Sequence, residues 1–151
     1  MKVPAACIAF AVMSSGAWAT EHLAGPYPAI VDRVVDGDTV RANVAVWLGM
    51  TLDVAVRVRG IDAPETHQPK CERERVLGEK AAARVVTLLP EGEAVTLTDV
   101  SQDKYGGRVV ARIRFAHDGR DIDLSTLMLD EGLAYQYDGG RKQSWCGEAS
   151  R

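Results

Sequence analysis

The stretch VVDGDTVRA, residues 34–42, places two aspartates on either side of a glycine in a segment that otherwise has the composition of a β-strand. Asp36 and Asp38 are close enough to repel each other, and strands disfavour both aspartate and glycine. We expect a tight turn here, in which Gly37 is required because a Cβ would crowd the bend. Another part of the fold must compensate for the two carboxylates.

Alternating apolar residues predict strands on both sides of this turn and further along the chain. The clearest example is TLDVAVRVR, where the apolar residues face one side and Arg57 and Arg59 face the other. The alternation ends at IDAPET, because Pro64 cannot donate to a strand ladder. The predicted strands are residues 29–35, 39–47, 51–59, 93–99 and 108–116.

Two helices are predicted between and after these strands. Apolar residues recur at helical spacing from Leu77 to Leu89, and Pro90 ends this stripe. The segment 124–131 predicts a short second helix, with Asp123 as its N-cap and Gly132 after its last turn.

The order of elements is three strands, a helix, two strands and a helix, which is a mainly β fold of the α+β class. A five-stranded OB-fold barrel requires this order, with one helix between strands 3 and 4 and a C-terminal helix. A generic α+β sandwich has the same order of elements. Periodicity alone does not separate the two architectures.

Composition predicts one folded domain without a broad basic surface. The chain has 151 residues, of which 46% are hydrophobic and 26% charged, and its formal net charge is −3. These proportions are ordinary for a folded soluble protein. The length is enough for one hydrophobic core.

Residues 1–19 have the features of a secretory signal. Lys2 precedes an apolar run, and small residues flank Trp18 at the end of the segment. A retained membrane anchor is the alternative, although the apolar run is short for a membrane span. We therefore predict a periplasmic or secreted protein without stable membrane association after cleavage, with a linker at 20–28 and a C-terminal tail at 139–151.

Two cysteines, Cys71 and Cys146, remain after removal of the signal. An even pair in an oxidising compartment favours a disulfide between them. Two free thiols or a metal site are the alternatives. A bond would connect the start of the first helix to the tail.

Charged side chains gather at the predicted strand ends and in the adjoining loops, where binding sites usually lie. Carboxylates without nearby histidines or thiols suit a hard cation such as Ca²⁺ or Mg²⁺. A cation between Asp38 and Asp62 would relieve the repulsion in the DGD turn. The alternative is a solvated hairpin whose aspartates only cap the turn. The candidates are Asp36, Asp38, Arg57, Arg59, Asp62, Glu65, Asp103 and Arg108.

Four motifs, VVDGDTV, RVRGIDAPET, DKYGGR and DEGLAYQY, follow one another in this order. In sequence and spacing they resemble the staphylococcal nuclease (thermonuclease-like) family, and the resemblance covers about residues 29–138. It implies an OB-fold barrel and an enzyme that cleaves phosphodiester bonds of DNA and RNA with Ca²⁺.

The resemblance also implies roles for individual residues. Asp38 and Asp62 correspond to the metal-ligating aspartates, and Ala63 supplies a backbone carbonyl to the metal. Glu65 corresponds to the glutamate that activates or orients the attacking water. Arg57 corresponds to the first catalytic arginine, whose planar fork fits phosphate oxygens.

Further residues are implied on the substrate side. Lys104 and Tyr105 correspond to a basic and an aromatic residue near the terminal phosphate of the bound nucleotide. Tyr137, and with weaker correspondence Tyr135, stacks on the nucleotide or hydrogen-bonds to it.

The chain departs from the family pattern in the second arginine. The usual Tyr-Gly-Arg is here Tyr105-Gly106-Gly107-Arg108, so that Arg108 is displaced by one residue. A one-residue shift turns a strand side chain to the opposite face. A bulge with Gly107 as the extra residue would return Arg108 to the phosphate.

The remaining charged candidates have simpler interpretations. For Arg59 we expect a surface ion pair. The histidines show no constellation with one another, and we expect all three on the surface: His22, His67 and His117.

Three functions follow from these observations. The first is an exported, monomeric, calcium-dependent nuclease that acts on DNA or RNA with low sequence specificity. The alternative is a catalytically weak or inactive OB-fold module of the cell envelope that binds nucleotides or single strands. The third is a disulfide-braced scaffold, against which the combination of Asp38, Arg57, Asp62 and Glu65 argues.

Overall fold

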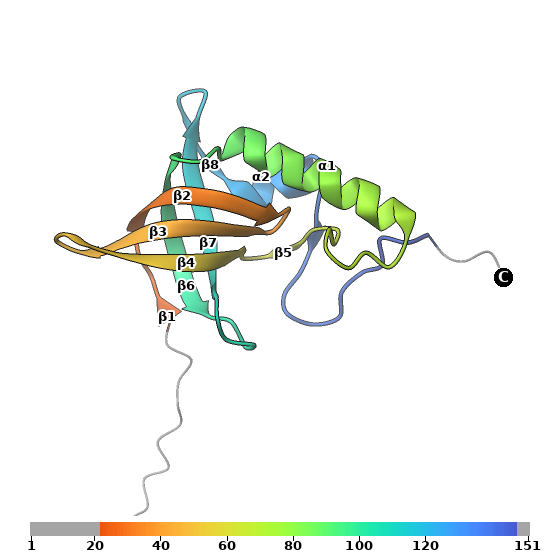
Figure 1. Cartoon of the computed structure of the whole chain (residues 1–151), viewed down its shortest axis with the longest axis horizontal. Coiled ribbons are helices and arrows are strands. Elements are labelled where there is room, and N and C mark those ends of the chain that lie inside the picture. The colour runs from red at the N-terminus through yellow and green to blue at the C-terminus, as the bar shows by residue number, and fades with distance from the viewer. Residues whose placement is uncertain (1–21, 148–151) are drawn as a thin grey trace, which may run out of the picture.

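Five strands close into a barrel in the computed structural model, which describes residues 22–147 (Figure 1). The strands are β2 (Tyr27–Asp36), β3 (Thr39–Trp47), β4 (Met50–Val58), β6 (Ala94–Gln102) and β7 (Val109–His117). They pair in the order β6-β2-β3-β4-β7, and β6 also pairs with β7, which closes the ring. Only the β4–β7 pairing is parallel among these five. The OB-like α+β fold is therefore confirmed.

The barrel closes because alternate residues of each strand are apolar and point inward. Val31, Val40, Val56, Leu97 and Ile113 are all at most 2% exposed. The predicted strands agree with the observed ones to within three residues at every end. Charged residues of these strands, such as Asp53 and Arg112, lie on the exposed face.

Four very short strands were not predicted. They are β1 (His22–Leu23), β5 (Ile61–Asp62), β8 (Arg120–Asp123) and β9 (Tyr135–Gln136). Strands of two to four residues are too short to show an alternating pattern. The antiparallel pair of β5 and β9 brings the C-terminal segment beside the chain that leaves β4.

Helix α1 (Glu72–Leu88) lies across one end of the barrel (Figure 1). It begins five residues before the first apolar residue of the predicted stripe, and its buried face includes Ala81 and Val85. Cys71 is the N-cap, and its Sγ accepts a hydrogen bond from the backbone N–H of Glu74 at 3.4 Å. The start of the helix at Cys71 agrees with the sequence analysis, although a cysteine is not one of the preferred cap types.

Helix α2 (Leu124–Asp130) has Asp123 as its N-cap, which confirms the prediction. The carboxylate of Asp123 accepts hydrogen bonds from the backbone N–H groups of Ser125 at 3.0 Å and Thr126 at 3.2 Å. Leu124 and Met128 are fully buried against the barrel. Neither helix in residues 22–147 is long and apolar enough to cross a membrane.

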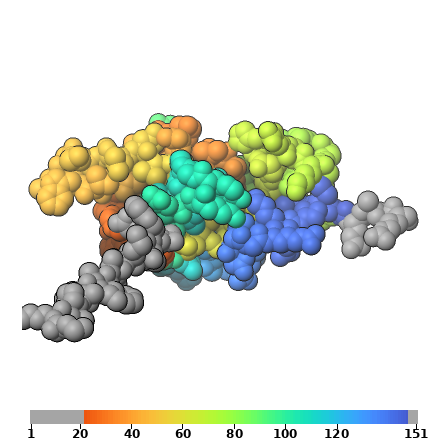
Figure 2. Space-filling model, turned by 90° about the horizontal axis from the view of Figure 1, so that it is seen from below, coloured from red at the N-terminus to blue at the C-terminus, as the bar shows by residue number. Residues whose placement is uncertain are grey.

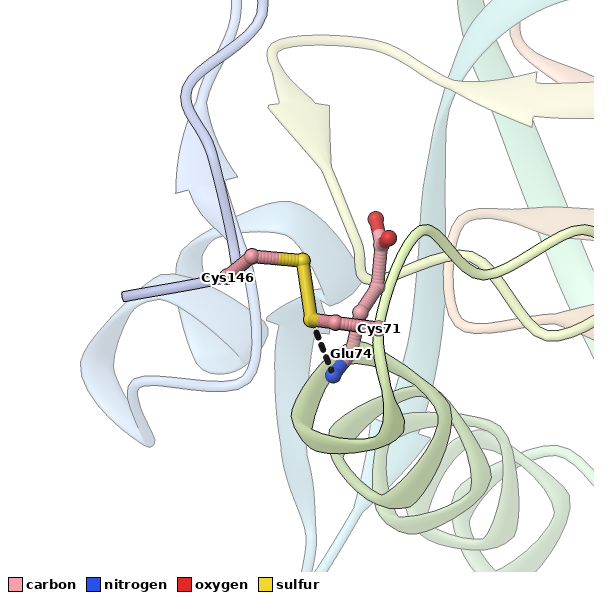
Figure 3. Close-up of side chains that lie close together, drawn as sticks. All are labelled: Cys71, Glu74 and Cys146. Atoms are coloured by element: carbon pink, nitrogen blue, oxygen red, sulfur yellow. Dashed lines mark hydrogen bonds between the residues drawn. A yellow bond between two sulfur atoms is a disulfide. The ribbon is translucent and has the colours of Figure 1, made fainter. Parts of the chain in front are cut away.

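Cys71 and Cys146 form a disulfide, with their Cα atoms 6.0 Å apart (Figure 3). The alternatives of free thiols and of a metal site are therefore wrong. The two cysteines are 75 positions apart in the sequence. A disulfide that closes a loop of this size stabilises the fold by about 4 kcal/mol in the chain-entropy model. The predicted signal, residues 1–19, lies outside the described residues.

Replacing Asp123 by alanine tests the capping interaction and its pH dependence. Burial raises the pKa of Asp123, but hydrogen bonds from Ser125 and Thr126 and the ion pair with Arg112 outweigh it and lower the pKa. The stabilisation is therefore present above the unfolded pKa of about 3.9 and is lost as the pH falls through the folded pKa. We expect Asp123→Ala to lower the free energy of unfolding by about 1 kcal/mol at pH 7, and by less at pH 3.

Urea denaturation at the two pH values measures this difference. Asp121→Ala is the matched control, since Asp121 makes an exposed ion pair with Arg114 and caps no helix. Equal unfolding midpoints for wild type and Asp123→Ala at pH 7 would contradict the prediction.

Candidate functional site

The DGD turn lies between β2 and β3 and against helix α1. The backbone N–H of Asp38 donates to the carboxylate of Asp36 at 2.9 Å, which holds the turn. A Cβ on Gly37 would lie 2.7 Å from the Cβ of Ala63 and 2.8 Å from the Cβ of Ala81. Glycine is therefore required because two distant segments pack onto the turn, in addition to the crowding that was expected from the bend itself.

Arg57 of β4 joins the two aspartates that the sequence analysis singled out. Its guanidinium contacts Asp38 at 2.8 Å and Asp62, the last residue of β5, at 3.1 Å. The side chain of Arg57 is 12% exposed and those of the aspartates are 5% exposed. Buried charges require partners. The positive charge of Arg57 therefore offsets part of the negative charge of Asp38 and Asp62.

Asp38 has a partner for each carboxylate oxygen. Oδ1 faces Arg57 and accepts from the hydroxyl of Thr39 at 3.0 Å, and Oδ2 accepts from the backbone N–H of Ala63 at 3.0 Å. Burial raises the pKa of Asp38 to about 6, against the opposing effect of Arg57. Burial alone would lower the pKa of Arg57, but Asp38 and Asp62 outweigh it and raise that pKa.

Asp62 has a second cationic partner that the sequence analysis missed. Lys142, from the segment predicted as an irregular tail, places its Nζ 2.6 Å from Oδ1 of Asp62. The disulfide and the β5–β9 pairing return the C-terminal segment to this region. The Cys71–Cys146 pairing was the one signal in the sequence that pointed to this return.

Glu65 lies in the loop that follows β5. Its carboxylate accepts hydrogen bonds from the backbone N–H groups of His67 at 3.0 Å and Thr66 at 2.9 Å. These bonds lower the pKa of Glu65, so the group is ionised at neutral pH. The side chain is 44% exposed and therefore accessible to water.

A cation has candidate ligands beside this loop. Ligand atoms of Asp36, Glu65 and His67 lie within 4.8 Å of one another. His67 was expected on the surface and is exposed, but its place beside Glu65 was not anticipated. In a second such group, Cys71, Glu74 and Cys146, the two sulfurs are bonded to each other and are not thiolate ligands.

A cleft of about 510 Å³ brings together most of the predicted substrate-side residues. It lies between the β6–β7 turn and the C-terminal segment, which are side by side in Figure 2. Five basic and two acidic side chains line it, a local excess of three positive charges in a chain with a net charge of −3. The predicted residues that line it are Arg57, Lys104, Tyr105, Arg108 and Tyr137.

The extra glycine is accommodated within the β6–β7 turn. Gly106 and Gly107 both have positive φ angles, of 73° and 74°. The turn closes through a hydrogen bond from the backbone N–H of Asp103 to the carbonyl of Arg108 at 3.2 Å. The Arg108 guanidinium pairs with the Asp103 carboxylate and lines the same cleft as Arg57.

Arg59 also lines the cleft but is held by the barrel. It pairs with the carboxylate of Asp99 at 2.9 Å and donates to Ser101 Oγ and to the carbonyl of Val110. The expected ion pair is therefore present, although it is partly buried. A larger hollow of about 730 Å³ lies elsewhere on the barrel and brings together none of the predicted site residues.

The closed barrel and its cationic cleft define an OB-fold protein with a site suited to phosphate groups. A family model described as staphylococcal nuclease homologue matches residues 55–147, more than half of the chain. The chain belongs to this family. The match extends through the segment 139–147, which the sequence analysis assigned to the tail, and the DGD turn lies before its start.

The sequence is also similar to Endonuclease YhcR of Bacillus subtilis (strain 168). The two are 36% identical over 119 residues, which is 75% of this chain. The aligned region is only 9% of the Bacillus protein. The similarity therefore concerns one part of a much longer relative.

Replacing Gly37 by alanine tests the packing under the DGD turn. The new methyl group would overlap Ala63 and Ala81, so we expect the free energy of unfolding to fall by about 1–3 kcal/mol. Denaturant unfolding measures the change. Gly147→Ala is the control, since its Cβ would meet only Arg73 at an ordinary 3.5 Å. A Gly37→Ala protein as stable as the control would show that the turn is loosely packed.

Proposed function

We propose that the protein is an exported nuclease that hydrolyses phosphodiester bonds of DNA or RNA with Ca²⁺ and little sequence preference. The observation that carries the proposal is the position of Arg57, which contacts Asp38 and Asp62 and lines the cleft together with Arg108. Family membership and the name of the Bacillus relative support a nuclease activity.

The donor set near Arg57 fits a hard cation. Asp38, Asp62 and the backbone carbonyl of Ala63 are the proposed ligands, and all three offer oxygen atoms, which Ca²⁺ prefers. Lys142 balances the one negative charge that the two carboxylates carry in excess of Arg57, so the proposed cation would take the place of its ammonium group beside Asp62. Bound there, Ca²⁺ would stabilise the negative charge that develops on the phosphate in the transition state.

The side chains of the site have complementary roles in this proposal. The guanidinium groups of Arg57 and Arg108 bind phosphate oxygens in pairs and stabilise the same developing charge. Glu65, kept ionised by the N–H groups of Thr66 and His67, orients the attacking water and accepts its proton. Its partly exposed position allows water to reach it.

Substrate binding is assigned to Lys104, Tyr105 and Tyr137, which line the cleft. The Tyr105 ring is 78% exposed and available to stack on a base. Stacking and phosphate contacts read no base edges, which supports low sequence specificity.

Export is supported by the disulfide, because disulfides persist in the periplasm and outside the cell. We propose that residues 1–19 direct this export and that the remaining chain acts as a monomer in the periplasm or the medium.

A binding module without turnover is the second candidate. The observation in its favour is the pairing of Arg108 with Asp103, which engages the second arginine within the chain. In that case the cleft would hold nucleotides or single strands without cleaving them.

Replacing Glu65 by glutamine tests the proposed reaction. Glutamine keeps the shape of the side chain but accepts no proton, so we expect the cleavage rate to fall by about 10²–10⁴-fold. Glu79→Gln is the control, because Glu79 lies on the exposed face of α1 and pairs with Arg75. Digestion of single-stranded and duplex DNA and of RNA by residues 20–151 measures the rates.

Each digestion is run with Ca²⁺ and with a chelator, and thermal melting is followed in parallel. We expect cleavage only with Ca²⁺. We also expect Ca²⁺ to raise the melting temperature of the wild type by more than it raises that of Asp62→Asn. Nucleotide binding without cleavage by folded wild type would favour the binding module. Equal rates for Glu65→Gln and Glu79→Gln would remove Glu65 from the reaction.

A further inference from the structure

The segment 137–146, here called the C-terminal arm, is fixed at both ends. At its start, the backbone N–H of Tyr137 donates to the carbonyl of Gly60 at 2.9 Å, beside the β5–β9 pair. At its end, Trp145 stacks on Tyr135 with ring centroids 3.7 Å apart and an angle of 11°. The adjacent Cys146 is bonded to Cys71 at the start of α1 (Figure 3).

The arm forms one wall of the cationic cleft. Tyr137, Gly139 and Lys142 line the cleft from the arm, and the β6–β7 turn lines it from the other side (Figure 2). Lys104 of that turn donates from Nζ to the carbonyl of Gly139 at 3.4 Å. The two walls therefore meet at a contact between segments 35 residues apart.

Lys142 is the most accessible basic group of the arm wall. Its Nζ lies 2.6 Å from Asp62 and 5.9 Å from the centroid of the Tyr137 ring, and the side chain is 53% exposed. An ammonium group has three donors. Asp62 is the one carboxylate that Lys142 contacts among residues 22–147.

The arginines of the cleft are held more firmly by the chain. Arg57 faces two carboxylates and is 12% exposed, Arg59 pairs with Asp99 and is 27% exposed, and Arg108 pairs with Asp103 and is 32% exposed. Lys142 thus has more contact with solvent than any of the three, and a mobile polyanion reaches it more easily.

We propose that Lys142 binds a phosphate group of the nucleic-acid strand, and that the disulfide-closed arm holds it at the cleft for this purpose. The proposal rests on the proposed function and adds a substrate contact that lies in none of the four sequence motifs. A phosphate competes with Asp62 for the ammonium donors, and a lysine recognises it as a compact charge whatever the base sequence.

Binding of a labelled oligothymidylate in the presence of a chelator tests the inference without turnover. We expect Lys142→Gln to weaken binding by about fivefold to tenfold and to reduce the slope of log affinity against log salt by about 0.7, the value for one phosphate contact on a single strand. Lys142→Arg should keep most of the affinity, because the charge remains.

Arg141→Gln is the matched control, since it removes the same charge from the neighbouring residue of the arm, which does not line the cleft. We expect it to keep the wild-type salt slope. Circular dichroism and thermal melting confirm that both glutamine variants are folded.

The role of the disulfide is tested by Cys71→Ser/Cys146→Ser. If the bond acts by holding the arm, this variant loses about as much affinity as Lys142→Gln, and combining the changes costs little more. Additive losses would show that the bond and Lys142 act separately and would overturn the role given to the arm. Reduced wild-type protein, held below its melting temperature, provides the same comparison should the double variant not fold.

The outcomes separate this inference from the proposed function. Equal affinities and salt slopes for Lys142→Gln and Arg141→Gln would overturn the inference, while cleavage by wild type would still support the nuclease. A folded wild type that neither binds the oligonucleotide nor cleaves nucleic acid would overturn both.

Discussion

The site depends on the contact of one buried guanidinium with two buried carboxylates. Arg57 holds Asp38 and Asp62 together, and so connects the DGD turn before β3, the end of β4 and the short strand β5. None of these charges is stable alone at this level of burial. With two negative charges and one positive, the group keeps an unbalanced negative charge, and the ammonium of Lys142 next to Asp62 balances it.

Long alternating segments were sufficient to predict the five strands, because each has one apolar and one polar face. Their closure into a barrel came from the family resemblance, since periodicity did not separate a barrel from a sandwich. The cap at Asp123 was also predictable, since it depends on neighbouring residues alone. The capping role of Cys71 was not predictable, because cysteine is an unusual cap. The pairing of β5 with β9 involves only two residues on each side, which is below what periodicity detects.

The candidate site was predictable where its residues lie within motifs and not where it depends on distant segments. Arg57, Lys104, Tyr105 and Arg108 line one cleft as the motifs implied. The packing reason for Gly37 involves a helix residue 44 positions away, which no local pattern reveals. Lys142 escaped notice because its position follows from the path of the chain back from α2. The net charge of the chain likewise conceals a cleft of the opposite sign.

The disulfide also has a topological consequence. Residues 71–146 form a covalent ring that includes both helices, β6, β7 and the exposed turn with its two glycines. Exposed turns are the usual targets of proteases. A single cut at Gly106 or Gly107 would open the ring but would leave the two fragments covalently joined. The two walls of the cleft would therefore stay joined after a first proteolytic cleavage at this turn.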